Sequence, residues 1–368
     1  MIAKLTFLAI LGLALAFIIR LSVILDLGKQ VYNHRPGPCR TVAGIKHGSE
    51  DIEVVKELSV AFITSGLYYM QERAPEVKGQ IFLYDFAQPI DNQTKTRSVV
   101  PLKINGKFDR ENFYPHGISS IISNGKIRLY VISHTKKFEH SVEVFDFDHT
   151  KRELNFVKTI KNSEFKRPNN IIAVGLDQFI LSNDGSGQNT ILNFIELAIS
   201  VKAGNVIYYD GQVVHHLVPS EISPNGIALS KNKEYLIVSS PNEKTLVVYK
   251  LSKDFKHSTQ VSRIDLGSAP DNVIVDESNS AWVGTHPILY QAFKYCLNPD
   301  DLNVKSPSRI LRVAFTPDFS KWTITEPYSN DGSEVSGSSV AAYYRGQLLI
   351  GTIYRTLLQC DVVHLSVL

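Results

Sequence analysis

One pattern returns six times along this chain, and it constrains the fold more than any other feature. Each copy places a polar residue or dipeptide directly before an apolar strand, and a turn and a second apolar strand follow. The copies begin at or beside Glu50, Pro115, Pro168, Pro224, Asp271 and Gly337. Spacings of roughly 45 to 65 residues suit four-stranded blades with variable loops. The repeat predicts an all-β chain folded as a six-bladed β-propeller.

The residues between these copies agree with short strands. Beyond residue 40, β-branched and aromatic runs are separated by turn residues about every 8–12 residues, as in all-β proteins. Examples of such runs are 81–85, 142–146, 206–210, 246–249 and 310–314. With 43% hydrophobic residues in 368, the chain has enough apolar sequence for a sizeable core. We therefore expect residues 28–368 to form a single propeller domain.

The N-terminus has a different composition and predicts a membrane-directed helix. Residues 5–19 are apolar apart from Thr6, and a second, mostly apolar stretch, 21–25, follows Arg20. Together they approach the ~20 residues that span a bilayer. Cleavage after Ala16 would fit a signal peptidase but would leave apolar residues on the mature chain. We predict an uncleaved signal anchor at residues 1–27, with a secreted, cleaved form as the alternative.

Three cysteines bear on ring closure and on the compartment. A propeller usually closes by pairing strands from the two chain ends, which would make Cys39 and Cys360 neighbours. We expect a disulfide there, with two buried free thiols as the alternative, and expect Cys296 to stay unpaired. Asn92 begins an N-glycosylation sequon. Disulfides persist in oxidising compartments, so we predict a secretory-pathway protein with a lumenal or extracellular body.

One segment departs from the β pattern, and the charges are evenly scattered. Residues 189–201 carry an apolar stripe at helical spacing, made by Leu192, Ile195, Ala198 and Ile199. We predict a short helix over one mouth of the tunnel, or a helix that faces the membrane beside the N-terminal segment. The net charge of +3 includes no basic block that could neutralise a row of phosphates, so nucleic acid is not an expected partner.

The polar residues of the repeats predict a metal site. The innermost strand of every blade begins at the central channel, so equivalent positions of the repeats converge there. These positions hold Glu50, Asp51, His116, Asn169, Asn170, Asn225, Asp271 and Asn272. Carboxylate and carboxamide oxygens suit Ca²⁺ better than Mg²⁺ or Zn²⁺. The alternative is that these are good turn residues at strand ends; their recurrence in four of six repeats favours the metal.

Blocks spread over nearly the whole chain resemble the paraoxonase/arylesterase family, in the same order and at similar spacing. The blocks are 48–51, 115–119, 170–175, 183–184, 225–227, 271–272, 282–287 and 348–352. The resemblance implies a calcium-dependent lactonase and arylesterase, built as a six-bladed propeller with a retained hydrophobic N-terminus and a disulfide joining the chain ends. It also implies two calcium ions in the tunnel.

The resemblance assigns roles to single residues. The ligands of the catalytic calcium, which polarises the substrate carbonyl, would be Glu50, Asn169, Asn225, Asp271 and Asn272. The ligands of a deeper structural calcium would be Asp51, Asn170 and the carbonyl of Ile118. The family usually has Asp at the position of Asn170, and losing that carboxylate should weaken the deeper ion. His116 and His134 match the imidazole pair that activates water.

Two functions follow from the resemblance. The first is hydrolysis of lactones and aryl esters by a His-activated water; a Gly-x-Ser-x-Gly motif is absent from the sequence, so a serine nucleophile has no support. The second is non-catalytic, because some membrane-anchored relatives are assembly factors for channel subunits in the endoplasmic reticulum. The long apolar leader and Asn170 fit that role too.

Overall fold

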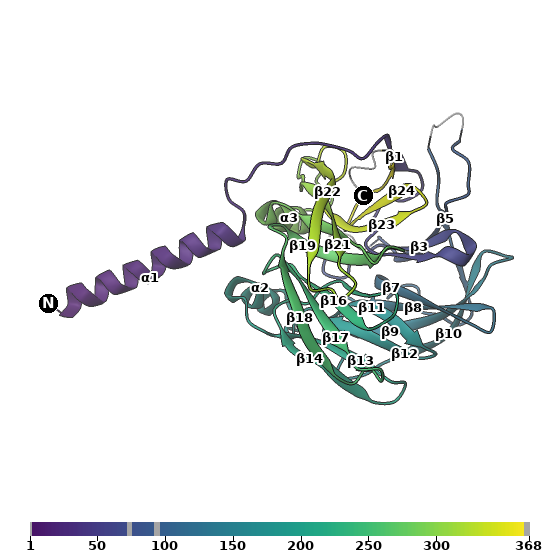
Figure 1. Ribbon diagram of the computed structural model, residues 1–368, viewed down its shortest axis with the longest axis horizontal. Coiled ribbons are helices and arrows are strands. Elements are labelled where there is room, and N and C mark those ends of the chain that lie inside the picture. The colour runs from purple at the N-terminus through teal and green to yellow at the C-terminus, as the bar shows by residue number, and fades with distance from the viewer. Residues whose placement is uncertain (1, 72–75, 92–95, 364–368) are drawn as a thin grey trace.

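The fold is a six-bladed β-propeller, as the repeat predicted. The computed structural model describes residues 2–71, 76–91 and 96–363. Within them, six β-sheets surround a common axis (Figure 1). The sequon residue Asn92 lies outside the described residues.

Blades one to three use the first half of the chain. Blade one contains β2 (Ile52–Val55), β3 (Val60–Ser65), β4 (Gln80–Asp85) and β5 (Val100–Pro101). Blade two contains β7 (Tyr114–Ser123), β8 (Lys126–His134), β9 (His140–Asp148) and β10 (Glu153–Ile160), with β6 (Lys103–Asn105) added in parallel at its outer edge. Blade three contains β11 (Pro168–Gly175), β12 (Gln178–Asn183), β13 (Gly204–Tyr209) and β14 (Val214–Glu221).

Blades four to six complete the ring. Blade four contains β15 (Ile227–Leu229), β16 (Tyr235–Ser240), β17 (Thr245–Leu251) and β18 (Ser258–Asp265). Blade five contains β19 (Ala269–Val275), β20 (Ala281–His286), β21 (Ser308–Phe315) and β22 (Trp322–Asn330). Blade six contains β23 (Ser338–Tyr344), β24 (Gln347–Thr352), β25 (Leu357–Asp361) and, from the other end of the chain, β1 (Cys39–Val42).

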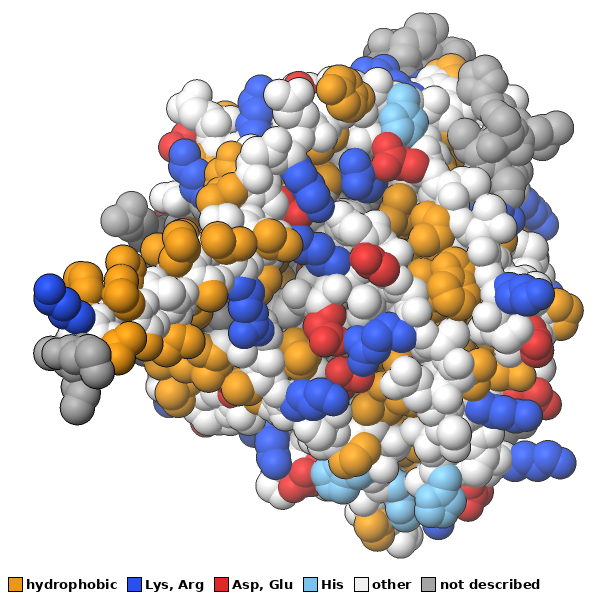
Figure 2. Space-filling model, turned by 60° about the vertical axis from the view of Figure 1, so that its left-hand side comes forward, with side chains coloured by type: hydrophobic (Ala, Val, Ile, Leu, Met, Phe, Trp, Pro, Cys, Tyr) orange, Lys and Arg blue, Asp and Glu red, His pale blue; other side chains and the backbone are white. Residues whose placement is uncertain are grey.

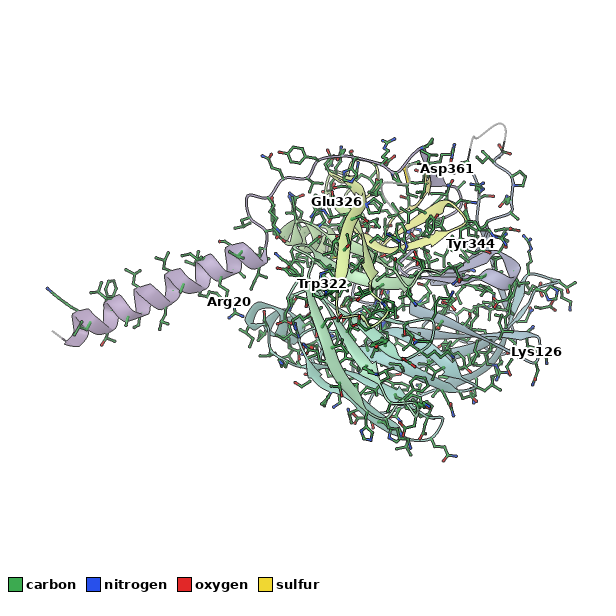
Figure 3. All side chains as sticks on the ribbon, in the orientation of Figure 1. Arg20, Lys126, Trp322, Glu326, Tyr344 and Asp361 are labelled. Atoms are coloured by element: carbon green, nitrogen blue, oxygen red, sulfur yellow. A yellow bond between two sulfur atoms is a disulfide. The ribbon has the colours of Figure 1, made fainter. Side chains whose placement is uncertain are left out.

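The ring is closed by the antiparallel pair of β1 and β25. Cys39 stands opposite Cys360 in the register, and the two form the predicted disulfide. An ion pair between Arg40 Nη1 and Asp361 Oδ2, at 2.7 Å, joins the same two strands (Asp361 is labelled in Figure 3). Cys296 is free and half-buried, as expected. Closure therefore combines backbone pairing, a covalent bond and an ion pair.

The core lies between neighbouring blades. The second strands β3, β16 and β20 are buried at every position, because both faces of each sheet pack against another blade. Their sequences accordingly read as short continuous apolar runs. Near the axis the blades come closest: a Cβ on Gly117 would lie 2.7 Å from the carbonyl oxygen of Asn169, and one on Gly226 would lie 2.5 Å from Asn272 Cα. Glycine at these two positions lets the innermost strands approach each other.

Two short helices cover the end of the propeller at which the innermost strands begin. The first, α2 (Thr190–Ile199), follows the second strand of blade three, and the second, α3 (Leu289–Leu297), follows the second strand of blade five. A second strand runs antiparallel to the first, so it ends where the first begins. The prediction of short helices over the tunnel mouth is thus confirmed. A 3₁₀ turn, η1 (Lys56–Leu58), lies in blade one.

The N-terminal helix α1 (Ile2–Ile24) projects from the propeller at this same end (Figure 1). Hydrophobic side chains cover its surface (Figure 2). Its residues from Lys4 to Ile24 are long and apolar enough to cross a membrane, a test that a signal sequence also passes. The helix is followed by a buried carboxylate, Asp26, which is 2% exposed.

Asp26 attaches the end of α1 to the propeller. Its Oδ1 pairs with Lys244 Nζ of blade four at 2.5 Å and also with Lys29 Nζ. Its Oδ2 accepts a hydrogen bond of 3.2 Å from the backbone N–H of Leu289, at the start of α3. A negatively charged carboxylate there also interacts favourably with the positive, N-terminal end of the α3 helix dipole. The segment after α1 is therefore held against the same face that carries α2 and α3.

We predict that the ring-closing disulfide contributes strongly to stability. Replacing both Cys39 and Cys360 by Ser should lower the free energy of unfolding by on the order of 2–5 kcal/mol, because the unfolded chain regains the freedom of a very long loop. Denaturant unfolding measures this loss, and Cys296→Ala is the matched control for removal of a free thiol. A double variant as stable as the wild type would contradict the prediction.

Candidate metal and catalytic site

The residues predicted to converge stand at the starts of the innermost strands, where a local backbone feature orients them. In blades two, three and five the ladder shifts register over the two residues after a proline. Such bulges turn side chains away from the regular pleat, and proline removes a ladder donor. The same order of a proline, two polar or glycine residues and an apolar strand occurs in four blades, at Pro115, Pro168, Pro224 and Pro270.

Serine hydroxyls tie neighbouring blades together at this level. Ser182 Oγ donates to the carbonyl oxygen of Asn225 at 2.5 Å, and Ser239 Oγ donates to that of Asp271 at 2.6 Å. Ser339 Oγ of blade six donates to the carbonyl oxygen of Glu50 at 2.7 Å. Each bond crosses from one blade to the next. The backbone of the site residues is therefore fixed by contacts between blades as well as within them.

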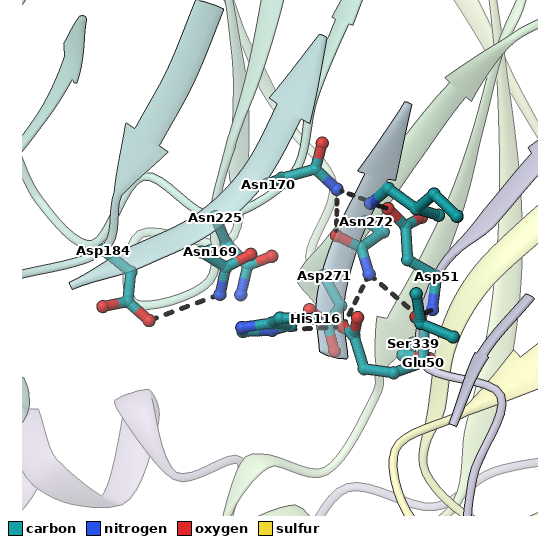
Figure 4. Close-up of polar contacts among 12 residues, drawn as sticks. Glu50, Asp51, His116, Asn169, Asn170, Asp184, Asn225, Asp271, Asn272 and Ser339 are labelled. Carbon is teal, nitrogen blue, oxygen red and sulfur yellow. Dashed lines mark hydrogen bonds and ion pairs between the residues drawn. The ribbon is translucent and has the colours of Figure 1, made fainter. Parts of the chain in front are cut away.

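Three buried oxygens of the site have no hydrogen-bond partner. They are Glu50 Oε2, Asn169 Oδ1 and Asn225 Oδ1, and they come from blades one, three and four. Leaving a buried acceptor unpaired costs about 1–3 kcal/mol. All three belong to the predicted ligand set of the catalytic calcium, and their side chains are among those drawn in Figure 4. Unpaired carboxylate and amide oxygens are the donor set that a hard cation such as Ca²⁺ uses.

The other two predicted ligands lie in the same network. Asn272 Nδ2 donates to Glu50 Oε1 at 2.7 Å and to the Glu50 carbonyl oxygen at 3.0 Å. Asp271 Oδ2 lies 3.1 Å from His286 Nε2. The described residues contain no group of three His, Cys, Asp or Glu side chains that could hold a metal, so a cation here would depend on the amide oxygens of Asn169 and Asn225. Four of the predicted residues thus fit one cation with mixed carboxylate and amide ligands: Glu50, Asn169, Asn225 and Asp271. The Asn272 amide, as arranged, donates to Glu50 and accepts from Asn170.

The deeper site is arranged differently. Asn170 Nδ2 donates to Asp51 Oδ2 at 3.1 Å and to Asn272 Oδ1 at 2.8 Å. Asp51 also accepts from the backbone N–H groups of Ile118, at 3.0 Å, and Ile52, at 2.9 Å. Burial and then the charge of Glu50 raise the pKa of Asp51 to about 8. The Asn170 amide donates where a cation would need an acceptor, so these residues, as arranged, do not fit a second ion.

The two predicted histidines are in contact. His116 Nδ1 lies 2.9 Å from His134 Nε2, and the ring of Tyr69 stacks on His134 at a centroid distance of 4.3 Å. His116 Nε2 lies 3.4 Å from Glu50 Oε1. Burial lowers the pKa of His116, but the charge of Glu50 and nearby carboxylates outweigh it, so the pKa is raised. The pKa of His134 is lowered far below its usual value by burial and by neighbouring imidazoles.

No site role was predicted from the sequence for His140, Asp184, Arg167 or Glu196. His140 Nδ1 lies 2.8 Å from His134 Nδ1 across the hairpin of β8 and β9. Asp184 accepts from Asn169 Nδ2 at 3.3 Å and pairs with Arg167, which also reaches Glu196 of α2 at 3.1 Å. Strand pairing could have revealed His140, since it stands opposite His134 in the hairpin register.

Comparisons with known proteins find relatives that match nearly the whole chain. A family model described as Arylesterase matches residues 31–362. Human serum paraoxonase/lactonase 3 is 32% identical over 367 residues, which cover 98% of this chain and 99% of that protein. Mechanosensory abnormality protein 6 of Caenorhabditis elegans is 30% identical over 357 residues, which cover 95% of this chain and 92% of that protein.

Solved structures support the fold alone. A luciferin-regenerating enzyme superposes with a TM-score of 0.52 at 11% identity, covering 89% of this chain and 96% of that one. A gluconolactonase from Xanthomonas campestris superposes with a TM-score of 0.51 at 12% identity, covering 91% of this chain and 99% of that one.

We predict that the buried imidazoles make the fold sensitive to acid. Burial lowers the pKa of His140 to about 4, whereas an unfolded histidine titrates near 6.5. Between these two pKa values the unfolded chain binds more protons than the folded one. The contribution of the neutral His140 to the free energy of unfolding is therefore largest above pH ~6.5 and is lost as the pH falls towards ~4. Urea unfolding at several pH values should show a smaller loss for His140→Gln than for the wild type.

The control for this titration is His257→Gln, which removes an exposed histidine. It should keep the pH dependence of the wild type. Equal slopes for the wild type and His140→Gln would contradict the burial effect.

Proposed function

Because this chain belongs to the arylesterase family, we propose that it is a calcium-dependent hydrolase of lactones and aryl esters. Family membership supports the hydrolase class. The chemistry is carried by one observation, the three unpartnered oxygens of Glu50, Asn169 and Asn225 beside the imidazole of His116.

The oxygens would hold the cation, and the imidazoles would handle the proton. The proposed ligands are Glu50, Asn169, Asn225 and Asp271, and Asn272 would join them once its amide turns its oxygen towards the ion. Bound calcium would polarise the ester carbonyl and stabilise the negative charge that develops on its oxygen. His116 would accept a proton from the attacking water through Nε2. Before the attack, its Nδ1–H would donate to His134 Nε2, 2.9 Å away, which orients the ring and leaves Nε2 free to accept.

We propose that the tunnel takes one calcium rather than two. The hydrogen bonds of Asn170 support this. Its amide nitrogen donates to the side-chain oxygens of Asp51 and Asn272, so these oxygens already have a donor in the place of a deeper ion. Asp51, Asn170 and Ile118 would then support the upper site structurally. Asn272 links the two levels, since it also donates to Glu50.

The N-terminal segment supports a membrane-bound protein of the secretory pathway. Residues 1–27 would act as the signal anchor, with the propeller of residues 28–368 in the lumen or outside the cell. The Cys39–Cys360 disulfide agrees with an oxidising compartment, where Asn92 would be available for glycosylation. The exposed side chains of Leu192, Ile195 and Ile199 on α2 support a helix that faces the membrane beside the end of α1.

A second candidate is an assembly factor for membrane channel subunits. It is favoured by the 30% identity to Mechanosensory abnormality protein 6, whose name refers to mechanosensation rather than to a hydrolase. In that role the propeller would bind a partner protein, and the calcium would support structure alone. The two candidate functions can be distinguished by an activity assay, because only the hydrolase would turn over an ester or lactone.

Turnover by the purified protein tests the proposal. We expect phenyl acetate or a lactone from a panel to be hydrolysed with calcium and not with a chelator. His116→Gln should lower kcat by about 10²–10⁴-fold, because it removes the general base. His257→Gln, an exposed histidine, is the control and should keep wild-type turnover. A folded, calcium-binding protein that is inert towards the whole panel would overturn the hydrolase and favour the assembly factor.

Calcium stoichiometry tests the single ion. Equilibrium dialysis should find one tightly bound Ca²⁺ per chain, and Asn170→Asp should add a second by supplying a carboxylate at the deeper site. Asn124→Asp, in the exposed turn between β7 and β8, controls for the added charge. Two ions bound by the wild type would contradict the proposal.

A further inference from the structure

We propose that His140 connects the buried pair of His116 and His134 to solvent. In this role it would pass the proton of ester hydrolysis between His134 and solvent water. This inference rests on the proposed hydrolase function and deepens it. His140 would act through His134 and would not touch the substrate. It is therefore a positioning and relay residue.

The geometry forms a continuous chain of ring nitrogens. His116 Nδ1 and His134 Nε2 are 2.9 Å apart, and His134 Nδ1 and His140 Nδ1 are 2.8 Å apart. Both nitrogens of His134 are therefore occupied by another imidazole. Each of these distances suits a hydrogen bond, and each bond can carry a proton from one ring to the next.

The outer ring, His140, is the most exposed of the three imidazoles. His134 is completely buried and His116 is 8% exposed, whereas His140 is half-buried. His140 also lines an open pocket of about 420 Å³ at the surface of blade two, together with Glu139, Lys161 and Lys166. The outer end of the chain thus meets water, while the inner end faces Glu50 in the tunnel.

The surroundings of His140 favour its neutral form. Burial lowers its pKa to about 4, Asp184 acts in the opposite direction, and His116 and Arg167 add to the lowering. The ring also faces His134 on β8 and the edge of Tyr69, while the pocket contributes Glu139, Lys161 and Lys166. A neutral imidazole accepts at one nitrogen and donates at the other, which is what a relay requires.

Ester hydrolysis requires the row of three imidazoles to make two proton transfers: removal of a proton from the attacking water and, later, protonation of the leaving oxygen. During attack, the water O–H bond breaks as its oxygen bonds to the carbonyl carbon, and the proton goes to His116 Nε2. His116 Nδ1–H then passes to His134 Nε2, His134 Nδ1–H passes to His140 Nδ1, and His140 Nε2–H passes to water in the pocket. All three rings stay neutral, with their tautomers reversed.

The second transfer runs in the opposite direction. As the bond between the carbonyl carbon and the leaving oxygen breaks, His116 Nε2–H protonates that oxygen. A proton enters at His140 Nε2, and the three rings return to their first tautomers. The products are an alcohol or phenol and a carboxylic acid, which ionises in water after release.

A purely structural role for His140 makes a different prediction. His140→Gln keeps an acceptor for His134 Nδ1–H, so it preserves the orientation of His134, but an amide cannot exchange protons between two nitrogens. His140→Phe removes both properties. A relay therefore suffers in both variants, whereas a structural contact suffers only in His140→Phe.

The test uses the full chain with calcium and an aryl ester in dilute buffer. We expect His140→Gln to lower kcat by about tenfold or more with little change in KM, and added imidazole to restore kcat by replacing the lost proton carrier. Wild-type kcat should not respond to imidazole. His215→Gln, a histidine paired with Asp210 in blade three, is the control and should behave as the wild type.

A second readout does not depend on turnover. Side-chain ¹⁵N NMR at pH 7 should find His140 neutral, with the proton on Nε2 and an acceptor at Nδ1. A cationic His140 at that pH, or wild-type kcat for His140→Gln in dilute buffer, would overturn the relay and leave the hydrolase intact. A wild type that turns over none of the esters or lactones would overturn both.

Discussion

The pairing of β1 with β25 is the constraint on which the rest of the structure depends. The five candidate ligands come from four different blades, so the distances between blades at the site are set only when the ring is closed. The Cys39–Cys360 disulfide and the ion pair of Arg40 with Asp361 act at this single seam. Serine hydroxyls link the closed ring to the site: Ser339 Oγ of blade six, for example, donates to the carbonyl oxygen of Glu50 in blade one.

Closure also concentrates groups that would avoid each other in an open chain. Glu50, Asp51 and Asp271 are buried near the axis. Burying carboxylates is unfavourable unless they are protonated, hydrogen-bonded or paired with a cation. The two levels of the tunnel resolve this differently: Asp51 is surrounded by amide donors, whereas Glu50 keeps one oxygen without a partner. The upper level is accordingly the one that fits calcium.

Much of the fold could be predicted from the sequence because it follows from a repeat, and the repeat also indicated which polar residues meet at the axis. A proline, two polar or glycine residues and an apolar strand mark the start of a blade, and equivalent positions must meet at the axis. Features that depend on one specific contact could not be predicted. The Asn170 amide between Asp51 and Asn272, the pairing of His140 with His134 and the attachment of Asp26 to α3 all require side-chain geometry.

The central claim is that the unpaired oxygens of Glu50, Asn169 and Asn225 are calcium ligands. A crystal structure of the protein grown with calcium tests this most directly. We expect a single ion within about 2.3–2.6 Å of Glu50 Oε2, Asn169 Oδ1 and Asn225 Oδ1, with the Asn170 amide still bonded to Asp51. The claim would be contradicted if these three oxygens stayed without an ion, or if calcium bound only at the deeper level.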